Sequence, residues 1–216
     1  MKSLELRKTS DGLLLVAAKR AVDLAGASLL LLVLAPVFIL IALMIKIDSA
    51  GPVLFRQWRL GFRGRRFLMF KFRTMCAGAE ADIEELIIRD SAKRIVWEEF
   101  QKLWDDPRLT GFGRYLRKLS LDEFPQLWNV LKGEMSLVGP RPITPDQREI
   151  YGGDFDLYTS VKPGITGMWQ VNGRNRTSFR QRILWDAYYI KNWTLGLDLS
   201  ILLRTIGVVL TGEGAF

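Results

Sequence analysis

The chain contains no histidine and a single cysteine, Cys76, among its 216 residues. Without histidine, Ser-His-Asp triads, histidine general bases and histidine-rich zinc sites are excluded. Acid, base or metal chemistry must therefore come from carboxylates, lysine or tyrosine. A lone cysteine excludes an intramolecular disulfide and fits a reducing compartment. Because no histidine can activate its thiol, Cys76 is interpreted as a small packing residue.

Charge is also missing from one long stretch near the start of the chain. The 22 residues between Asp23 and Lys46 carry no charge. A straight helix of this length would rise ~33 Å, which is enough to cross a bilayer. Basic residues flank the stretch on both sides: Lys2, Arg7, Lys8, Lys19 and Arg20 before it, and Lys46, Arg56, Arg59, Arg63, Arg65 and Arg66 after it. The positive-inside tendency predicts that both ends stay on the cytoplasmic face.

Pro36 lies near the middle of this apolar run. It lacks the amide that would bond the carbonyl of Leu32, so a bend is expected there. A bent helix that enters one leaflet and leaves on the same side satisfies both observations. A single-span anchor is the alternative, and these residues alone leave both open. The run is too long for a signal peptide, and no small-residue cleavage site follows it, so we expect the segment to stay in the mature protein.

The charge that is present is unevenly distributed. The chain has 31 Lys and Arg residues against 23 Asp and Glu residues, a net charge of +8. From Ser49 to Ala79 there are seven basic residues and no acidic one. Beside a membrane segment, such a block suits anionic headgroups or a phosphate-bearing ligand. Charge alone would also allow nucleic acid, but the membrane anchor argues against a nucleic-acid partner.

Hydrophobic periodicity and turn residues predict a mixed set of elements. Segments 53–59 and 66–73 form an expected β-hairpin, in which Lys71 and Arg73 are two apart and should share one face. The expected helices are residues 79–104, 111–119, 178–192 and 197–210, and residues 166–174 resemble a strand. The last helix is too short to span a membrane. Packing in a core and lying at the membrane interface are equally open for it.

Two motifs carry candidate chemistry. The run Ser120-Leu121-Asp122-Glu123 has the form of a capping box and predicts a helix that begins at 120–122. Acidic residues in a first turn are common stabilisers, so Asp122 and Glu123 also have a purely structural explanation. Further on, Arg141 lies between Pro140 and Pro142. A guanidinium held rigidly in this way suits a grip on phosphate, although such a turn can also be only structural.

Several separate segments, taken together, resemble the bacterial monotopic phosphoglycosyl transferases and the sugar-phosphate transferases that begin exopolysaccharide or O-antigen synthesis. The segments are KRAVDL before the apolar run, GPVLFRQWRLG after it, KFRTM at Lys71–Met75, RKLSLDEFPQLWNVLKGEMSLVGPRP at Arg117–Pro142, and KPGITGMWQVNGR at 162–174. The resemblance covers nearly the whole chain.

The resemblance implies an α+β fold: a mainly helical, membrane-associated domain with a re-entrant membrane helix, a small β-hairpin and amphipathic interfacial helices. Residues 1–47 would form an N-terminal amphipathic segment and the re-entrant helix, broken at Pro36. Residues 48–216 would form a catalytic domain on the cytoplasmic face of the bacterial inner membrane. The family often has Ser-Pro at the break, whereas this chain has Ala35-Pro36, so one hydroxyl hydrogen bond is missing.

The resemblance also implies an activity. Family members move a sugar-1-phosphate from a UDP-sugar to undecaprenyl phosphate, and UMP leaves. Asp122 matches the aspartate that attacks the β-phosphorus to form a covalent intermediate, and Glu123 is its catalytic partner. Mg²⁺ is the expected cofactor, held by Asp122 and Glu123. The basic positions of the family's motifs match Lys71, Arg73, Arg117 and Arg141, which are assigned to the phosphates and nucleotide.

Two other functions stay open on the residues alone. One is a multi-span transferase that works by direct displacement, although a single convincing apolar run argues against it. The other is a non-enzymatic, membrane-tethered scaffold with a basic surface for acidic lipids or partners. The ending TGEGAF at 211–216 resembles hexose-1-phosphate transferases and favours galactose or glucose. The sequence is also compatible with a homo-oligomer.

Overall fold

The computed structural model describes residues 10–76, 78–79, 82–101, 103 and 105–211. It is mostly helical and has two small sheets, which confirms the expected α+β class. The TGEGAF ending lies outside the described residues, except for Thr211, and so does the start of the predicted N-terminal amphipathic segment. The predicted division at residue 47/48 falls at the end of the first helix and stays a prediction.

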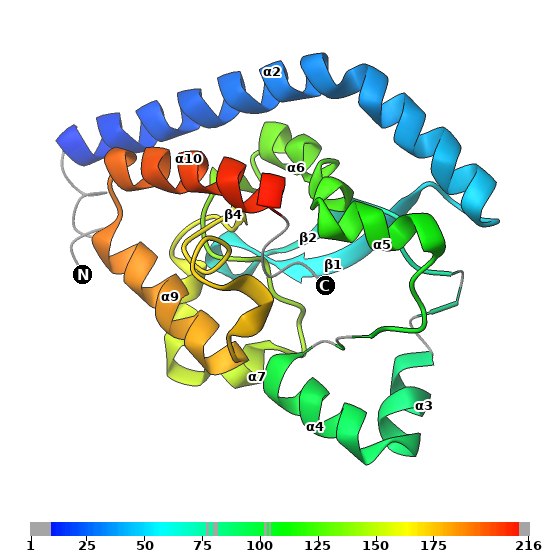
Figure 1. Cartoon of the computed structure of the whole chain (residues 1–216). Coiled ribbons are helices and arrows are strands. Elements are labelled where there is room, and N and C mark those ends of the chain that lie inside the picture. The colour runs from blue at the N-terminus through cyan, green and yellow to red at the C-terminus, as the bar shows by residue number, and fades with distance from the viewer. Residues whose placement is uncertain (1–9, 77, 80–81, 102, 104, 212–216) are drawn as a thin grey trace.

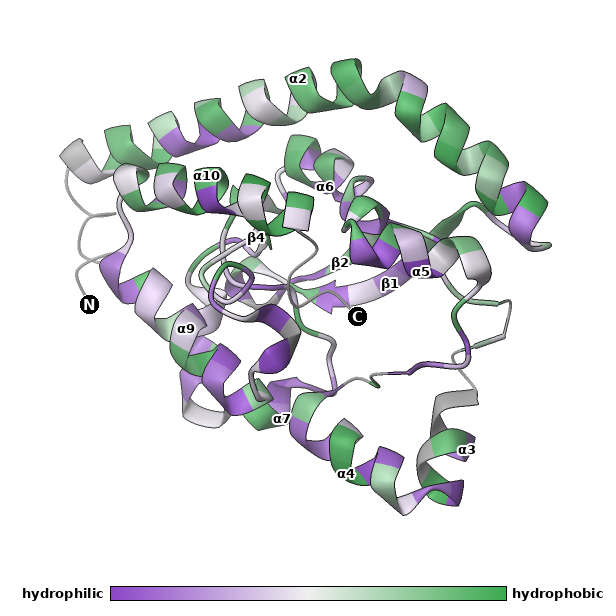
Figure 2. Cartoon of the chain, viewed as in Figure 1, coloured by the Kyte–Doolittle hydropathy of each residue, from purple (hydrophilic) through white to green (hydrophobic). Residues whose placement is uncertain are grey.

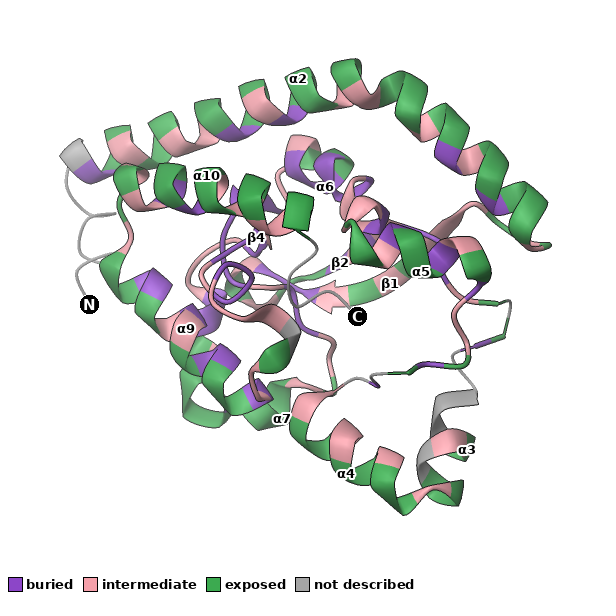
Figure 3. Ribbon diagram, viewed as in Figure 1, coloured by how far each residue is buried: buried purple, intermediate pink, exposed green. Residues whose placement is uncertain are grey.

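Helix α2 (Ser10–Asp48) contains the uncharged run and is the longest element of the described chain. It has Pro36 inside it, and in Figure 1 it runs across one side of the molecule and bends part-way along. Most of its apolar surface is exposed (Figures 2 and 3). Of the described residues, only this helix is long and apolar enough to cross a membrane.

The charged residues of α2 attach it to the rest of the domain. Arg20 donates to the carbonyls of Val130 (2.7 Å) and Leu131 (2.9 Å), near the end of α6 (Gln126–Lys132). Asp23 is buried and accepts from the Ser136 hydroxyl and from a backbone amide, both at 2.9 Å. The charges that precede the apolar run therefore face the domain and satisfy polar groups there.

The predicted hairpin is confirmed. Strand β1 (Leu54–Leu60) pairs antiparallel with β2 (Arg66–Phe72), and Leu54 lies opposite Phe72. The 3₁₀ turn η1 (Phe62–Gly64) connects them and has two residues with positive φ, Arg63 and Gly64. A glycine takes this backbone conformation without strain, which explains its place in the turn.

A second sheet joins β3 (Ser136–Val138) in parallel with β4 (Gly164–Thr166). The predicted strand at 166–174 is therefore wrong beyond Thr166. The chain continues as tight turns into η4 (Arg174–Arg176), because side chains such as Asn172 bond the local backbone, here the Met168 carbonyl. Such local bonds compete with a strand ladder.

The predicted helix 79–104 is also wrong as a single element. It divides into α3 (Asp82–Arg89) and α4 (Ser91–Phe100). Asp90 lies between them and accepts from the amides of Ala92 and Lys93, which makes it an N-cap that starts a new helix. The packing interpretation of Cys76, just before this region, is wrong as well, because its side chain is exposed.

The remaining predicted helices are confirmed as α5 (Gly111–Lys118), α9 (Phe179–Asn192) and α10 (Leu195–Thr211). Short helical turns α7 (Arg148–Tyr151), η3 (Gly152–Asp154) and α8 (Phe155–Thr159) precede α9. Helix α10 takes part in the core packing that the sequence left open, and its place at the membrane interface stays a prediction. Ile201 is fully buried in the main core, whereas Leu199, Leu203, Ile206 and Leu210 are exposed.

The main core holds these elements around one centre. Its buried side chains come from α2, β2, α6, β3, α9 and α10, including Ala27, Met69, Val130, Val138 and Ile201. The 3₁₀ turn η2 (Leu121–Glu123) lies between α5 and α6 and contacts both α5 and β2. The Asp-Glu pair is therefore presented from a short turn supported on several sides.

Candidate active site

The Asp-Glu pair lies in a short 3₁₀ turn that begins at Leu121, within the predicted onset at 120–122, but the predicted capping box at Ser120 is wrong. Ser120 has left-handed backbone angles (φ 57°, ψ 18°), and its side chain makes no cap hydrogen bond. Residues Leu121–Glu123 form η2, and α6 begins only at Gln126, after Pro125. The Ser120 hydroxyl instead accepts a short hydrogen bond from Arg174, a residue 54 positions away. A long-range contact has replaced the local cap.

Glu123 is held by two cations. Its Oε1 accepts from Lys71 Nζ at 2.8 Å and from Arg141 Nη2 at 2.9 Å. Burial alone would raise the pKa of Glu123, but Arg141 and Lys71 outweigh it and lower the pKa well below its usual value. Glu123 is therefore a fixed anion that organises the two cations around it.

Asp122 is in a different environment, although it is the next residue. Its Oδ2 lies 3.6 Å from Lys71 Nζ, beyond hydrogen-bond distance, and its side chain is buried. Burial raises the pKa of Asp122 above its usual value; the charge of Glu123 adds to this effect, and Lys71 opposes it. A carboxylate with few hydrogen bonds keeps its oxygen lone pairs available for attack or metal binding.

Arg117 is brought close to the pair, as its position in the motif predicted. It lies in the last turn of α5 and donates through Nε to the Thr74 hydroxyl at 3.0 Å. Burial lowers the pKa of Arg117, while the negative charges of Asp122 and Asp106 act against that shift. Arg117 thus supplies positive charge on the Asp122 side of the turn.

The Arg73 side chain bonds the chain after α2 and not the Asp-Glu pair. Strand β2 ends at Phe72, so Arg73 does not share the strand face of Lys71. Its guanidinium donates to the carbonyls of Ala50 (2.7 Å) and Ser49 (2.6 Å), just after α2 ends. The expected grouping of Lys71 with Arg73 is corrected: the structure brings Lys71 to the carboxylates and uses Arg73 to hold the exit of the apolar helix.

Arg174 is a site residue that the sequence-based assignment missed. Its guanidinium reaches Ser120, immediately before η2, and its backbone has a positive φ of 46°. Burial lowers the pKa of Arg174, and the charges of Glu123 and Asp122 oppose that shift. The sequence did contain a signal for Arg174, which is the last residue of the segment KPGITGMWQVNGR. That segment contributed to the resemblance, but no function was assigned to its arginine.

The metal-binding capacity of the pair is limited. Among the residues that the structure describes, no group of three or more Asp, Glu, His or Cys side chains is arranged to hold a metal. Mg²⁺ commonly binds one or two carboxylates and takes its other ligands from water and substrate phosphates. Asp122 and Glu123 fit that kind of shared site and do not fit a site built from protein ligands alone.

Comparison with known proteins identifies the family of this chain. A model of the family described as bacterial sugar transferase matches residues 15–212. The chain belongs to the bacterial sugar transferase family. This match confirms the resemblance drawn from its motifs, and it includes most of α2, the Asp-Glu turn and all five of the cations Lys71, Arg73, Arg117, Arg141 and Arg174.

Relatives in the bacterial sugar transferase family are similar over most of this chain. It is 46% identical to the UDP-galactose-lipid carrier transferase of Erwinia amylovora and 44% identical to the undecaprenyl-phosphate galactose phosphotransferase of Salmonella typhimurium. Each match covers 92% of this chain and 41% of the relative. The exopolysaccharide production protein ExoY of Rhizobium meliloti is 41% identical, over 92% of this chain and 88% of its own length. The chain thus spans about two fifths of the length of the first two relatives.

Proposed function

We propose that this protein transfers a hexose-1-phosphate from a UDP-sugar to undecaprenyl phosphate, releasing UMP, as the first membrane step of polysaccharide assembly. The observation that carries the proposal is the contrast within one turn. Asp122 is buried and only weakly paired, whereas the adjacent Glu123 is bound by Lys71 and Arg141. The names of the family relatives, which refer to a lipid carrier and to galactose, support the substrate classes.

In the proposed reaction, an Asp122 carboxylate oxygen attacks the β-phosphorus of the donor. A bond forms between this oxygen and phosphorus, and the bond to the oxygen that bridges to the α-phosphate breaks, so UMP leaves with that bonding pair. The phosphate oxygen of the lipid then attacks the same phosphorus. The acyl-phosphate bond breaks, the Asp122 carboxylate is regenerated, and a polyprenyl diphosphate-sugar forms.

The cations serve to neutralise the negative charge of the UDP-sugar. A diphosphate is anionic, so a carboxylate can approach its phosphorus only where positive charge surrounds the phosphate oxygens. Lys71, Arg141, Arg117 and Arg174 supply this charge, and Arg141 is suited to a two-point contact with phosphate. When bound by Asp122 and Glu123, Mg²⁺ would add Lewis-acid polarisation of the phosphoryl oxygens.

The membrane position follows from the acceptor, which is confined to the bilayer. The exposed apolar surfaces of α2 and α10 would lie in lipid, and the Asp-Glu turn would stand at headgroup height. The basic residues at both ends of the apolar run favour a re-entrant α2 on the cytoplasmic face of the inner membrane. Galactose and glucose are the sugars to test first, since two relatives are named for galactose.

The test is UMP release from UDP-galactose and UDP-glucose by the purified protein in nanodiscs that contain undecaprenyl phosphate. Asp122→Asn should reduce turnover to below ~1% of wild type, since the nucleophile is lost. Asp156→Asn, a change of the same kind on the exposed surface of α8, should retain full activity. A donor labelled in the β-phosphate, given without lipid, should leave its label on Asp122.

Each alternative has its own outcome. A membrane-tethered scaffold would release no UMP with either donor. Direct displacement would release UMP but leave no labelled aspartate, and Asp122→Asn would retain measurable turnover. A requirement for Mg²⁺ is tested in the same assay by chelation with EDTA and restoration with MgCl₂; full activity in EDTA would contradict it.

A further inference from the structure

The Pro-Arg-Pro turn that presents Arg141 is held through its carbonyl groups. Pro140 and Pro142 have no amide hydrogen, so this turn has few donors of its own. The Pro140 carbonyl accepts from the Gly164 amide at 2.8 Å, and the Pro142 carbonyl accepts from Arg59 Nη1 at 3.2 Å. Donors from elsewhere in the fold therefore decide where the turn lies.

The carbonyl of Arg141 itself is bound by two buried side chains. Arg182 Nη2 on α9 donates to it at 3.0 Å, and the Tyr158 hydroxyl on α8 lies 3.2 Å away. That hydroxyl also lies 3.2 Å from the Leu60 carbonyl. A phenol has one hydrogen, so Tyr158 can serve only one of these acceptors at a time. Arg182 is the donor committed to the Arg141 carbonyl.

Arg182 has no access to a substrate. Its side chain is 7% exposed, and it is packed against the rings of Trp169 and Phe179. Arg141 lies over the same Trp169 ring, with its guanidinium carbon 5.5 Å from the ring centroid. The two guanidinium groups are thus linked through one indole and one carbonyl, although Arg141 reaches Glu123 and Arg182 does not touch the site.

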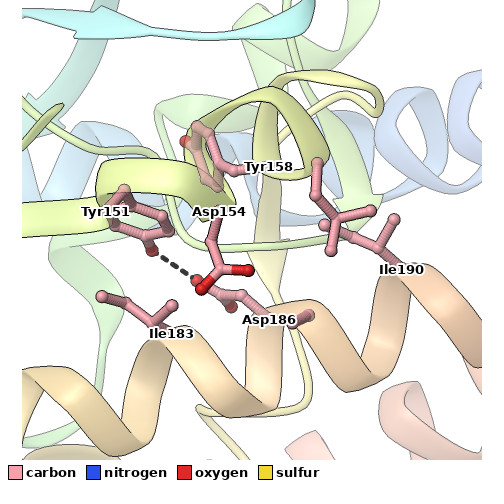
Figure 4. Close-up of a pocket in the computed structure, with 8 residues that line it drawn as sticks. Tyr151, Asp154, Tyr158, Ile183, Asp186 and Ile190 are labelled. Atoms are coloured by element: carbon pink, nitrogen blue, oxygen red, sulfur yellow. Dashed lines mark hydrogen bonds between the residues drawn. The ribbon is translucent and has the colours of Figure 1, made fainter.

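A buried arginine needs a counter-charge, and Asp186 supplies it. Asp186 lies one helical turn further along α9, 3.7 Å from Arg182 Nε, and is 2% exposed. It accepts from the Tyr151 hydroxyl at 2.7 Å, as the dashed line in Figure 4 shows. Figure 4 also shows Asp186 lining a small hollow with Tyr151, Tyr158 and Ile183. Arg182 is therefore fixed from behind by a hydrogen-bonded carboxylate.

We propose that Arg182, braced by Asp186, is a positioning residue for Arg141: it fixes the Pro-Arg-Pro turn so that the Arg141 guanidinium meets Glu123 and the donor phosphates. This inference rests on the proposed function for its catalytic consequence, but the turn geometry stands apart from it. A shift of about 1 Å in a substrate-positioning group can cost on the order of 100-fold in rate.

The test is a double-mutant cycle on UMP release in nanodiscs. Arg182→Met should lower kcat/KM by about 10- to 100-fold. In an Arg141→Lys background, which keeps the charge but loses the planar fork, the same change should cost less than about 3-fold.

Arg180→Met, an exposed arginine on the same helix, is the matched control and should have no effect. The double variant Arg182→Met/Asp186→Asn removes both buried charges and keeps the test valid if Arg182→Met alone folds poorly.

Hydrogen exchange supplies a readout that does not depend on catalysis. Arg182→Met should speed exchange in peptides that cover residues 139–143 and leave α6 and α10 unchanged. Equal losses in both backgrounds, or unchanged exchange at 139–143, would overturn the positioning role. If wild type releases no UMP, the proposed function fails, and the exchange result still decides whether Arg182 holds the turn.

Discussion

At the scale of single residues, two adjacent carboxylates have opposite electrostatic environments. Burial acts on both, yet the pKa of Asp122 is raised while that of Glu123 is lowered, because Arg141 and Lys71 bond directly to Glu123. Ionisation of an acid whose pKa is raised in the folded state lowers the free energy of unfolding of the protein. Ionisation of an acid whose pKa is lowered in the folded state raises that free energy. We therefore expect Asp122 to lower the free energy of unfolding and Glu123 to raise it.

This contrast predicts opposite effects on stability. Because the folded-state pKa of Asp122 is raised above its unfolded value, this carboxyl lowers the free energy of unfolding at pH 7, so Asp122→Asn should raise the melting temperature. The gain should shrink as the pH falls toward 3.8, the usual pKa of the group. Glu123→Gln should lower the free energy of unfolding at pH 7 by about 1–3 kcal/mol, because two cations lose their charged partner. The melting temperature should fall accordingly. That loss should fade as the pH falls below 4.5, where the unfolded chain begins to take up the proton.

Thermal unfolding followed by tryptophan fluorescence, at pH 7 and at about pH 3, measures both variants. Asp156→Asn on the surface is again the control. A lower melting temperature for Asp122→Asn at pH 7 would show that burial does not penalise this carboxylate.

At the scale of elements, close backbone contact joins the end of β3 to β4. A Cβ on Gly164 would lie 2.0 Å from the Gly139 amide nitrogen, and one on Gly139 would lie 2.6 Å from the Lys162 carbonyl oxygen. No side chain fits at either position without moving backbone. This contact sets the path of the chain into the Pro-Arg-Pro turn, since the Gly164 amide also bonds the Pro140 carbonyl.

Gly164→Ala should therefore destabilise the protein by about 1–3 kcal/mol, the usual cost of forcing extra atoms into packed structure. It should also reduce UMP release, because the turn that presents Arg141 would move. Gly153→Ala is the matched control, since a Cβ there meets nothing within 4 Å. Chemical denaturation and the nanodisc assay measure the two effects. Equal stability of the two variants would contradict the claim that backbone contact at Gly164 leaves no room for a side chain.

At the scale of the whole molecule, one long apolar helix is fastened to the domain at both ends. Arg20 and Asp23 bind α6 and β3 near its start, and Arg73 binds the chain just after its end. Exposed leucines and isoleucines occupy most of the surface between these points (Figure 2). A helix tied to one domain at both ends suits a re-entrant path better than a straight span.

Cysteine labelling of spheroplasts tests this path. The native Cys76 is exposed and lies after α2, and a second reporter, Thr9→Cys in a Cys76→Ser background, lies before it. Both thiols should be protected from a membrane-impermeant maleimide added outside, and both should react after lysis. A periplasmic cysteine marker serves as the positive control. Labelling of one reporter from outside would indicate a single-span anchor.

The sequence by itself determined the features that depend on local physics. The uncharged run with Pro36, the β-hairpin and the helix predicted at 178–192 follow from periodicity and turn residues, which involve neighbours only a few positions apart. The adjacency of Asp122 and Glu123 and the rigidity of the Pro-Arg-Pro turn were equally visible. The fold elements among these were predicted correctly, whereas the roles of Asp122, Glu123 and Arg141 stay predictions.

Only the tertiary structure decided what distant residues do to one another. Ser120 follows the capping-box pattern but bonds Arg174, and Arg73 shares a motif with Lys71 but caps α2. Arg182 supports Arg141 from 41 residues away. The opposite pKa shifts of the two carboxylates have the same origin. Burial and long-range pairing arise when remote segments meet and exclude water, and no local pattern of side chains encodes which segments those will be.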